Sequence, residues 1–333
     1  MLRQRSARRI FIPCFWLPAS RFSLSAFIYD LIGDIHGHVA ELRQLLQQLG
    51  YTPDAHGTYR HAAGRRVIFV GDFIDRGPTI REALQIVRGM VDSGAALAVM
   101  GNHEYNALAF WTADPAGGYL RPHWPHHSAQ HERTIAEFAA PERQAEWQAY
   151  LAWFHTLPLF LELPGLRVVH ACWGARCIAQ LRQWLPGNRL TPEFLLRASR
   201  KGSAEMDALE ITLKGHETNL PDPHHFFDKD GHRRTKVRAA WWRDPTATTC
   251  NDYYLEPIEA LANQPVDVAA LPEASYYRDE TPVFFGHYRL RDEPRLLTPH
   301  SVCLDYSVAR GGELVGYRWH GEQVLVPAGF VRA

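Results

Sequence analysis

Apolar runs alternate with helix-like stretches through the first hundred residues, and this alternation restricts the possible fold more than any other feature of the sequence. The runs FIYDLI, RVIFV and AALAVM have the length and apolar character of buried strands. Apolar side chains recur at helical spacing in the two stretches between these runs: Val39, Leu42, Leu46 and Leu49, then Ile80, Leu84, Val87 and Val91. Such strand–helix–strand units join parallel strands through right-handed crossovers. The pattern therefore predicts an α/β fold with a largely parallel sheet.

The remainder of the chain is less regular. Residues 110–160 have helical character with many Trp, His and Ala residues, and we interpret them as a helical insertion. Residues 186–275 are rich in proline and lack a clear period, which predicts an irregular insertion. Four further runs have the character of strands: LRVVHA, PVFFGH, SVCLDY and ELVGYRW. Because no repeat or clear linker divides the sequence, we expect one domain over residues 27–333.

The first 26 residues do not belong to this pattern. They carry four arginines before a short apolar patch, an arrangement that export signals also have. Arg21 and two prolines interrupt the patch, and the first predicted strand begins at Phe27, so we favour a disordered extension or a misassigned start over a signal. No run approaches the roughly 18 consecutive apolar residues of a membrane-spanning helix, and we expect no membrane partner.

Composition excludes several classes of protein. The 5 cysteines are odd in number and include no C-x-x-C pair, which argues against a disulfide scaffold and a zinc ribbon and favours a reducing, cytoplasmic compartment. Lys plus Arg and Asp plus Glu both number 36, so the formal charge is zero and we expect no nucleic-acid partner. The 18 histidines instead indicate that any metal chemistry uses nitrogen and oxygen ligands.

Five predicted strands end abruptly in side chains that can bind metal. The segments are GDIHG at 33–37, GDFIDRG at 71–77, GNHE at 101–104, VHA at 169–171 and FGH at 285–287. In an open α/β sheet, ligands bind in the crevice beyond the carboxyl ends of the strands. We therefore expect these five strand ends to converge on one point.

The donors at these strand ends are carboxylates, imidazoles and one amide: Asp34, His36, Asp72, Asn102, His170 and His287. This mixture of hard oxygens and borderline nitrogens suits Mn, Fe or Zn, whereas an all-oxygen set would suit Mg or Ca. Six ligands exceed the three or four that one zinc ion needs, so the set implies two ions with a carboxylate between them. Asp72, central in the series, is the expected bridge.

The series GDIHG, GDFIDRG, GNHE, VVHA and FFGH resembles the calcineurin-like metallophosphoesterases, in particular the bacterial type of their phosphoprotein-phosphatase (serine/threonine phosphatase) branch. The motifs occur in the family's order, with 38 residues from Asp34 to Asp72 and 30 from Asp72 to Asn102. The resemblance spans most of Tyr29 to Asp305. It implies a four-layer α/β/β/α sandwich with a dinuclear metal site at the C-terminal ends of the strands.

The resemblance also implies how the ligands are divided between two divalent or trivalent ions, for which we expect manganese, with iron or zinc as alternatives. Asp34 and His36 would hold one ion and Asp72 would bridge. The remaining ligands, mainly of the second ion, would be Asn102, His170 and His287.

Further roles follow from the same resemblance. His103 would be the general acid that protonates the leaving alkoxide, and Asp75 would orient its imidazole. Arg76 would grip two phosphate oxygens, with Asn102 and His103 also contacting the substrate. Glu104 would support the ligands from behind. A second phosphate-binding arginine is expected to be Arg238 or Arg243.

Two activities and one inactive alternative fit these motifs. The first is hydrolysis of phosphate monoesters, such as those of phosphoserine or phosphothreonine, by a hydroxide that the two ions share. The second is hydrolysis of a dinucleoside polyphosphate, so the partner would be a phosphorylated protein or a small phosphate ester or nucleotide. The third is a non-catalytic, metal-stabilised binding module, which the intact motifs at Asp34, Asp72, Asn102 and His103 disfavour.

The C-terminal region bears on this choice. Tyr306, Ser307 and Arg310 differ from the threonine-glycine-cysteine version that we associate with the dinucleoside tetraphosphate hydrolases, and we therefore rank the monoester first. Several tryptophans could stack on an adenine or pack in the core: Trp111, Trp124, Trp153 and Trp173. Histidines away from strand ends, including His216, are expected at the surface or at the rim of the substrate site.

Overall fold

The computed structural model describes residues 28–227, 231–271 and 276–333. The expectation for residues 1–26 lies outside this part of the chain. Within the three described ranges, none of the helices combines the length and the apolar character needed to cross a membrane.

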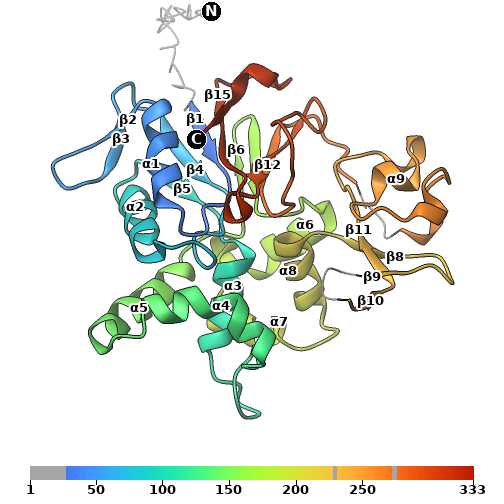
Figure 1. Cartoon of the computed structure of the whole chain (residues 1–333), viewed down its shortest axis with the longest axis horizontal. Helices are drawn as coiled ribbons and strands as arrows, with labels where there is room; N and C mark the ends of the chain where they lie inside the picture. The colour runs from blue at the N-terminus through green and yellow to red at the C-terminus, as the bar shows by residue number, and fades with distance from the viewer. Residues whose placement is uncertain (1–27, 228–230, 272–275) are drawn as a thin grey trace, which may run out of the picture.

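Two β-sheets form the centre of the molecule (Figure 1). The first is six-stranded, with its strands in the spatial order β14 (Asp305–Tyr306), β15 (Glu313–Trp319), β1 (Tyr29–Ile32), β4 (Arg66–Phe69) and β5 (Ala96–Ala98), and with β16 (Phe330–Arg332) paired to β15. The second is four-stranded, in the order β13 (Ser301–Cys303), β12 (Val283–Phe285), β7 (Leu166–Val169) and β6 (Phe160–Leu163).

Both sheets contain parallel and antiparallel pairs. The predicted strand–helix–strand units make β1, β4 and β5 parallel, with Leu31 opposite Ile68 and Ile68 opposite Leu97. β15, however, runs antiparallel to β1. In the second sheet, β12 is parallel to β7 and β13, and β6 is antiparallel to β7. The expected parallel pairing holds for β1, β4 and β5 and for β7, β12 and β13, and it is wrong for β6, β14, β15 and β16, which pair antiparallel.

The inner faces of the two sheets pack against each other. Side chains alternate between the two faces of a strand, so Ile68 of β4 and Phe284 of β12 point to the same buried layer, while the flanking residues Val67 and Val283 point outward. The inner layer is wholly apolar at its centre, with Leu31, Ile68, Val168, Phe284 and Val302 fully buried. Burial of this layer holds the two sheets together.

Helices cover the outer faces of the sheets. α1 (Val39–Gln48) and α2 (Ile80–Asp92) cover the first sheet, and α6 (Ala175–Trp184) and α8 (Ala204–Lys214) lie on the side of the second (Figure 1). The predicted apolar stripe of α1 is buried at Val39, Leu42 and Leu46. Helix, sheet, sheet and helix give the four layers that the resemblance implied, and the predicted fold class is confirmed.

Two groups of elements extend from this sandwich. α3 (Asn102–Trp111) leads into α4 (Pro125–Glu137) and α5 (Pro141–Phe154), which lie side by side at the lower left of Figure 1. On the right of that view is a smaller lobe with the ribbon of β8 (Glu217–Asn219) and β11 (Lys236–Arg238), the ribbon of β9 (Phe226–Phe227) and β10 (Arg233–Arg234), and α9 (Cys250–Tyr253).

Residues 186–275 also contain two helices that periodicity did not indicate, α7 (Pro192–Ala198) and α8. Both begin at hydroxyl residues that cap them: Thr191 Oγ accepts from the amide of Phe194, and Ser203 Oγ accepts from that of Met206. The hairpin of β2 (Tyr51–Pro53) and β3 (Tyr59–His61) follows α1. Short 3₁₀ turns complete the fold: Pro186–Asn188, Pro245–Ala247, Glu259–Leu261, Val268–Ala270, Val308–Arg310 and Pro327–Gly329.

Candidate metal centre

The five strand ends singled out in the sequence meet at one edge shared by the two sheets. Asp34, Asp72 and Asn102 follow β1, β4 and β5 of the first sheet, whereas His170 and His287 follow β7 and β12 of the second. All six expected metal ligands, together with His103 and Asp75, are buried. The structure therefore brings together residues from Asp34 to His287, as the topology of an open α/β sheet predicts.

The backbone at this edge is strained. Nine non-glycine residues in the described ranges have positive φ, and six of them belong to these loops: His36, Asp72, Asp75, Arg76, His287 and Arg289. Such conformations are costly for L-residues and persist where the surrounding structure imposes them, often at functional sites. At Gly101, an added Cβ would lie 2.2 Å from Asp72 Oδ1, so only glycine lets the third loop approach this carboxylate.

The carboxylate of Asp72 lies between two groups of imidazoles. Its Oδ1 is 3.4 Å from His170 Nε2, and its Oδ2 is 3.6 Å from His36 Nε2 and 3.9 Å from His103 Nε2. Each oxygen thus faces a different side of the site. This is the arrangement that a bridging carboxylate requires.

Backbone carbonyls orient two of these rings. His36 Nδ1 lies 2.9 Å from the carbonyl oxygen of Ile74, and His170 Nδ1 lies 2.8 Å from that of Val70. A carbonyl can only accept, so each Nδ1 carries the proton and each Nε2 is turned toward Asp72. Metal-binding histidines are commonly held in this way.

Two overlapping sets of ligand atoms result, in each of which the atoms lie within 4.8 Å of one another. They are His36, Asp72 and His103 on one side, and Asp72, His170 and His287 on the other. Asn102 belongs beside the second set, because its Oδ1 is 3.1 Å from His170 Nε2 and 2.8 Å from His287 Nδ1.

Asp34 is in neither of these two sets, and its expected pairing with His36 on one ion stays a prediction. Its Oδ2 accepts from the amide of His287 at 3.0 Å. Its Oδ1 is buried and lacks a hydrogen-bond partner, and a Cβ on Gly286 would lie 1.9 Å from this oxygen. A buried, unsatisfied carboxylate oxygen is costly, and a cation would satisfy it. The unpartnered oxygen of Asp34, together with the carboxylate and imidazole donors around it, therefore fits a metal centre.

The pKa shifts of the buried side chains are also consistent with a metal centre. Burial, then the charge of Asp305, raises the pKa of the Asp34 carboxyl well above its usual range. Burial would also raise the pKa of Asp72, but the imidazoles of His170 and His103 hold it well below its usual range. Burial, with the nearby His103, lowers the pKa of His36 to about 3, which leaves this ring neutral as a metal ligand must be.

Glu104 connects two of the loops. Its Oε2 accepts from the amides of Asp72 and Gly101 at 2.9 and 3.0 Å, and its Oε1 accepts from the amide of Phe73 at 2.8 Å. Glu104 thus binds the backbone of the loops that carry Asp72 and Asn102 and, among the described residues, does not itself bind a neighbouring ligand side chain, which is the supporting role expected from the sequence.

Asp75 lies beside His103, with Oδ2 2.5 Å from His103 Nδ1. Two residues that sequence reasoning missed bind its other oxygen: His131 Nδ1 at 2.7 Å and Thr134 Oγ at 2.6 Å from Oδ1. Both residues belong to α4, outside the motifs at the strand ends, so no local sequence pattern indicated that they contact Asp75.

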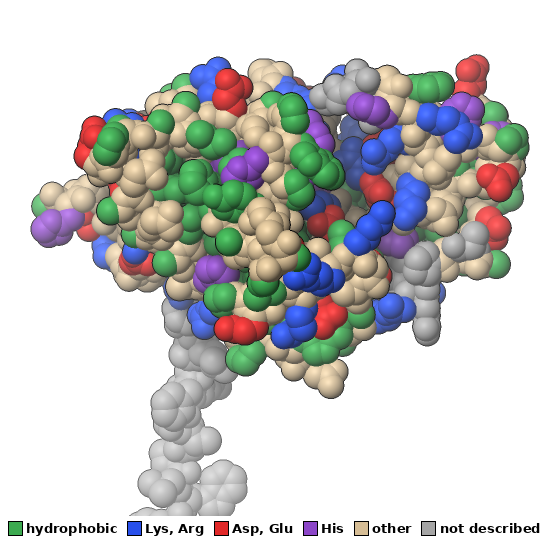
Figure 2. Space-filling view, turned by 90° about the horizontal axis from the view of Figure 1, so that it is seen from below, with side chains coloured by type: hydrophobic (Ala, Val, Ile, Leu, Met, Phe, Trp, Pro, Cys, Tyr) green, Lys and Arg blue, Asp and Glu red, His purple; other side chains and the backbone are tan. Residues whose placement is uncertain are grey.

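Arginines surround the open side of the site. The guanidinium of Arg76 lies 3.4 Å from His103 Nε2. Of the two expected second arginines, Arg238 acts electrostatically on His287 and is paired with Glu256 at 2.7 Å, whereas Arg243 lies at the surface, 3.9 Å from Asp252. Arg289, which sequence reasoning missed, joins Arg76 and Arg238: burial, then the charge of Arg76, lowers its pKa. Figure 2 shows Lys and Arg side chains around a hollow between the main body and the smaller lobe.

The sequence and the fold are similar to those of known proteins. The family model described as calcineurin-like phosphoesterase matches residues 29–288. The asymmetrical bis(5'-nucleosyl)-tetraphosphatase PrpE of Oceanobacillus iheyensis is 30% identical over 145 residues, which cover 43% of this chain and 54% of that protein. The enzyme of the same name from Bacillus mycoides is 27% identical over 310 residues, covering 90% of this chain and 94% of that protein.

The extent of these matches varies. In the first two curated relatives, from Oceanobacillus iheyensis and Bacillus subtilis, the match spans only about half of the relative's length, 54% and 57%. Among solved structures, one titled a putative diadenosine tetraphosphatase has a TM-score of 0.42 and 18% identity, over 92% of this chain and 93% of that one.

Proposed function

The chain belongs to the calcineurin-like phosphoesterase family, and on that premise we propose that this phosphate-ester hydrolase acts on the phosphate chain of dinucleoside polyphosphates. The sequence alone ranked phosphate monoesters, such as phosphoserine and phosphothreonine, first. Two observations favour the second of the two activities weighed there: the charge around the site and the names of the relatives.

The observation that carries the proposal is the cluster of Arg76, Arg238 and Arg289 beside the metal-ligand residues. Burial, and after it the charges of Arg76 and Arg238, lower the pKa of Arg289, and the buried Nε of Arg76 has no hydrogen-bond partner within the described residues. A phosphate monoester carries at most two negative charges, whereas a tetraphosphate chain carries several spread over its length. A polyphosphate would be long enough to contact Arg76 and Arg289 together, and also Arg238, which is paired with Glu256.

The relatives support the same substrate class. Several of them are named bis(5'-nucleosyl)-tetraphosphatase, including the protein from Bacillus mycoides that is matched over 94% of its length. Tyr306, Ser307 and Arg310, which had counted against a nucleotide substrate, line a surface hollow together with Leu290, the residue after Arg289. Besides burial, the charge of Arg310 also lowers the pKa of Arg289. These departures still favour the monoester, and the substrate panel decides between the two activities.

The proposal assigns the metal ions to the buried donors already described. Asp72 would bridge, His36 would bind on one side, and His170, His287 and Asn102 would bind on the other, with Asp34 completing the site; manganese is the proposed ion. When bound, two such cations supply Lewis acidity that activates a water molecule and neutralises charge on the transferred phosphoryl group.

The chain's own residues supply the proton and hold the phosphate. His103 would donate a proton from Nε2 to the leaving oxygen, because its Nδ1 is occupied by Asp75 and its Nε2 lies next to Arg76, the expected phosphate-binding residue. Asp75 would keep that ring oriented through its hydrogen bond to Nδ1. Arg76 would bind the phosphoryl oxygens with its planar guanidinium, next to the proton donor.

A substrate panel tests the proposal. Protein stripped of metal and resupplied with Mn²⁺ is assayed on diadenosine tetraphosphate, a phosphoserine peptide, an aryl phosphate and a bis-aryl phosphodiester. We expect the highest kcat/KM for the tetraphosphate. We also expect Arg289→Gln to lower that value about tenfold, with a smaller effect on the aryl phosphate.

The exposed Arg243→Gln is the matched control, because it removes the same charge at the surface, and it should leave all four rates unchanged. Faster turnover of the phosphopeptide than of the tetraphosphate would instead return the monoester to first place.

A further inference from the structure

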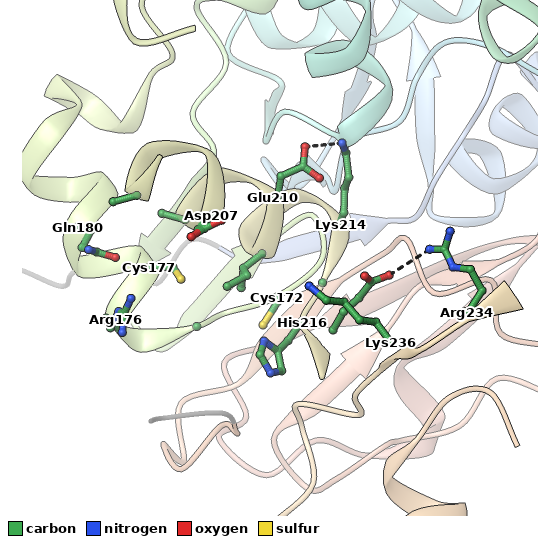
Figure 3. Close-up of a pocket in the computed structure, with 16 residues that line it drawn as sticks. Cys172, Arg176, Cys177, Gln180, Asp207, Glu210, Lys214, His216, Arg234 and Lys236 are labelled. Carbon is green, nitrogen blue, oxygen red and sulfur yellow. Dashed lines mark hydrogen bonds and ion pairs between the residues drawn. The ribbon is translucent and has the colours of Figure 1, made fainter. Parts of the chain in front are cut away.

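A second cavity, with a volume of about 590 Å³, lies beside the metal centre and has no part in the chemistry described so far. It is bounded by the segment after β7, by α6 and α8, and by the ribbon of β8 and β11 (Figure 3). Its size is that of a site for a small organic molecule rather than for a single ion.

The inner wall of this cavity is apolar and its rim is charged. Cys172, Cys177, Ala208 and Ile211 line the wall, and the first three are buried. At the rim, Lys214 is paired with Glu210 and Arg234 lies 3.9 Å from Glu217. Two further rim cations, Arg176 and Lys236, are exposed and form no ion pair with any residue that the structure describes. The cavity therefore offers both a surface for a flat apolar group and free positive charge for an anion.

His216 is the polar group inside. It is only 6% exposed, it lines the cavity, and its Nε2 has no hydrogen-bond partner among the described residues. Figure 3 shows its ring among Cys172 and Lys236. Burial lowers the pKa of His216, so the ring is neutral at physiological pH and can donate from one nitrogen and accept at the other. A buried imidazole nitrogen without a partner is a position that a hydrogen bond from a ligand would satisfy.

The segments that line the cavity also carry residues of the metal centre or lie next to them in the sequence. Cys172 follows the ligand His170 by two positions, and Tyr288 follows the ligand His287. The hydroxyl of Tyr288 packs on Gly215, where an added Cβ would lie 2.4 Å from it. β11 contributes Lys236 to the cavity and Arg238 to the arginines near His287. A chain of phosphates could therefore run from one site to the other along β11.

We propose that this cavity binds the nucleoside end of the substrate, with the base against the apolar wall, its edge hydrogen-bonded to His216, and the nearest phosphate beside Lys236 and Arg176. The inference rests on the proposed function, because it assigns the second half of a dinucleoside polyphosphate to a place outside the metal centre. A purine base suits the cavity since it combines apolar faces with donors and acceptors at its edge.

Binding of adenosine and AMP to the Mn²⁺-loaded protein tests the proposal by calorimetry. His216→Phe keeps a buried ring and removes its hydrogen bonds, and we expect it to weaken the binding of both ligands about fivefold. Lys236→Gln alters only an exposed side chain, so misfolding is not a concern; it should weaken AMP about threefold and leave adenosine unchanged. Lys201→Gln, an exposed lysine that does not line the cavity, is the matched control and should change neither.

The same variants separate this proposal from the proposed function. His216→Phe and Lys236→Gln should raise KM for diadenosine tetraphosphate and leave the hydrolysis of an aryl phosphate unchanged, because neither residue touches the metal ligands. If the wild-type protein does not cleave the tetraphosphate but binds AMP in a manner sensitive to both variants, the proposed function fails and the cavity stands. If adenosine and AMP bind equally well to wild type and both variants, or do not bind, the cavity proposal is overturned whatever the activity.

Discussion

His131 donates its Nδ1 proton to Asp75 Oδ1 at 2.7 Å, on the same carboxylate whose other oxygen lies against His103. Trp111 Nε1 donates to His131 Nε2 at 3.2 Å, so that nitrogen must accept and the proton must reside on Nδ1. A hydrogen-bonded chain thus runs from the indole of α3 through α4 to the proposed proton donor. It holds Asp75 in one orientation before any substrate arrives.

This chain predicts that His131 affects some substrates more than others. His131→Phe should leave Asp75 less well oriented and slow the reactions in which His103 must protonate a poor leaving group. We expect kcat to fall about tenfold for an alkyl phosphate and less than about twofold for p-nitrophenyl phosphate, whose leaving group needs no proton.

The control for this variant is His126→Phe, which changes an exposed histidine of the same helix. Equal losses on both substrates would mean that His131 only stabilises the fold.

Asp72 should be required for metal binding. Asn at this position keeps the shape of the side chain but loses its charge. It also replaces one acceptor oxygen with a donor, whereas both oxygens of Asp72 are needed because each faces a separate imidazole. We expect Asp72→Asn to lower both bound manganese and activity by at least about 100-fold, measured by elemental analysis and steady-state kinetics. Asp92→Asn, an exposed position at the end of α2, should change neither; normal metal content in Asp72→Asn would disprove the bridging role.

Metal should stabilise the folded protein. The site gathers buried carboxylates, one of whose oxygens has no hydrogen-bond partner, and cations bound only by the folded state relieve that cost. At a concentration 100-fold above Kd, one bound ion contributes about 2.7 kcal/mol, which corresponds to a rise of several degrees in Tm. Calorimetry of stripped protein with Mn²⁺, Fe²⁺ or Zn²⁺ measures this rise and ranks the ions, and Asp72→Asn should abolish it. An unchanged Tm with all three ions would contradict the metal centre.

A buried ion network centred on Asp30 of β1 should affect the stability of the protein but not its activity. Asp30 is fully buried and its carboxylate accepts from Arg65 Nε and Nη2, both at 2.8 Å, from Arg318 Nε at 3.0 Å, and from the Tyr51 hydroxyl at 2.9 Å. Asp30→Asn leaves two arginines without their counter-charge, and we expect the free energy of unfolding to fall by about 3–5 kcal/mol. Tyr51→Phe should cost only about 1 kcal/mol.

Urea denaturation measures both changes. The kcat of the folded fraction should stay at the wild-type value, since none of these side chains touches the site. A loss of kcat that exceeds the loss of folded protein would show that this network also shapes the active edge.

The central part of the fold could be predicted from the sequence because its helices and strands are marked by patterns within a few residues. Helical spacing in α1 and α2 and the apolar runs of β1, β4 and β7 are short-range patterns, and each strand was found where it was expected. The helices α7 and α8 were not foreseen, since their capping residues Thr191 and Ser203 lie in a stretch where proline hides the period. The antiparallel return of β15 was also missed, because no local pattern states which strand a distant segment pairs with.

The same division holds for the site. The sequence by itself determined the family and which strand ends carry metal-type donors, because a motif such as GDIHG places ligand, turn and strand within a few residues of one another. Only the tertiary structure decided that His103 lies beside His36 and Asp72, that His131 binds Asp75, and that His216 lines a cavity together with Cys172. Those relationships join residues about 30 to 70 positions apart, and they depend on how whole helices and sheets pack, which no short stretch of sequence encodes.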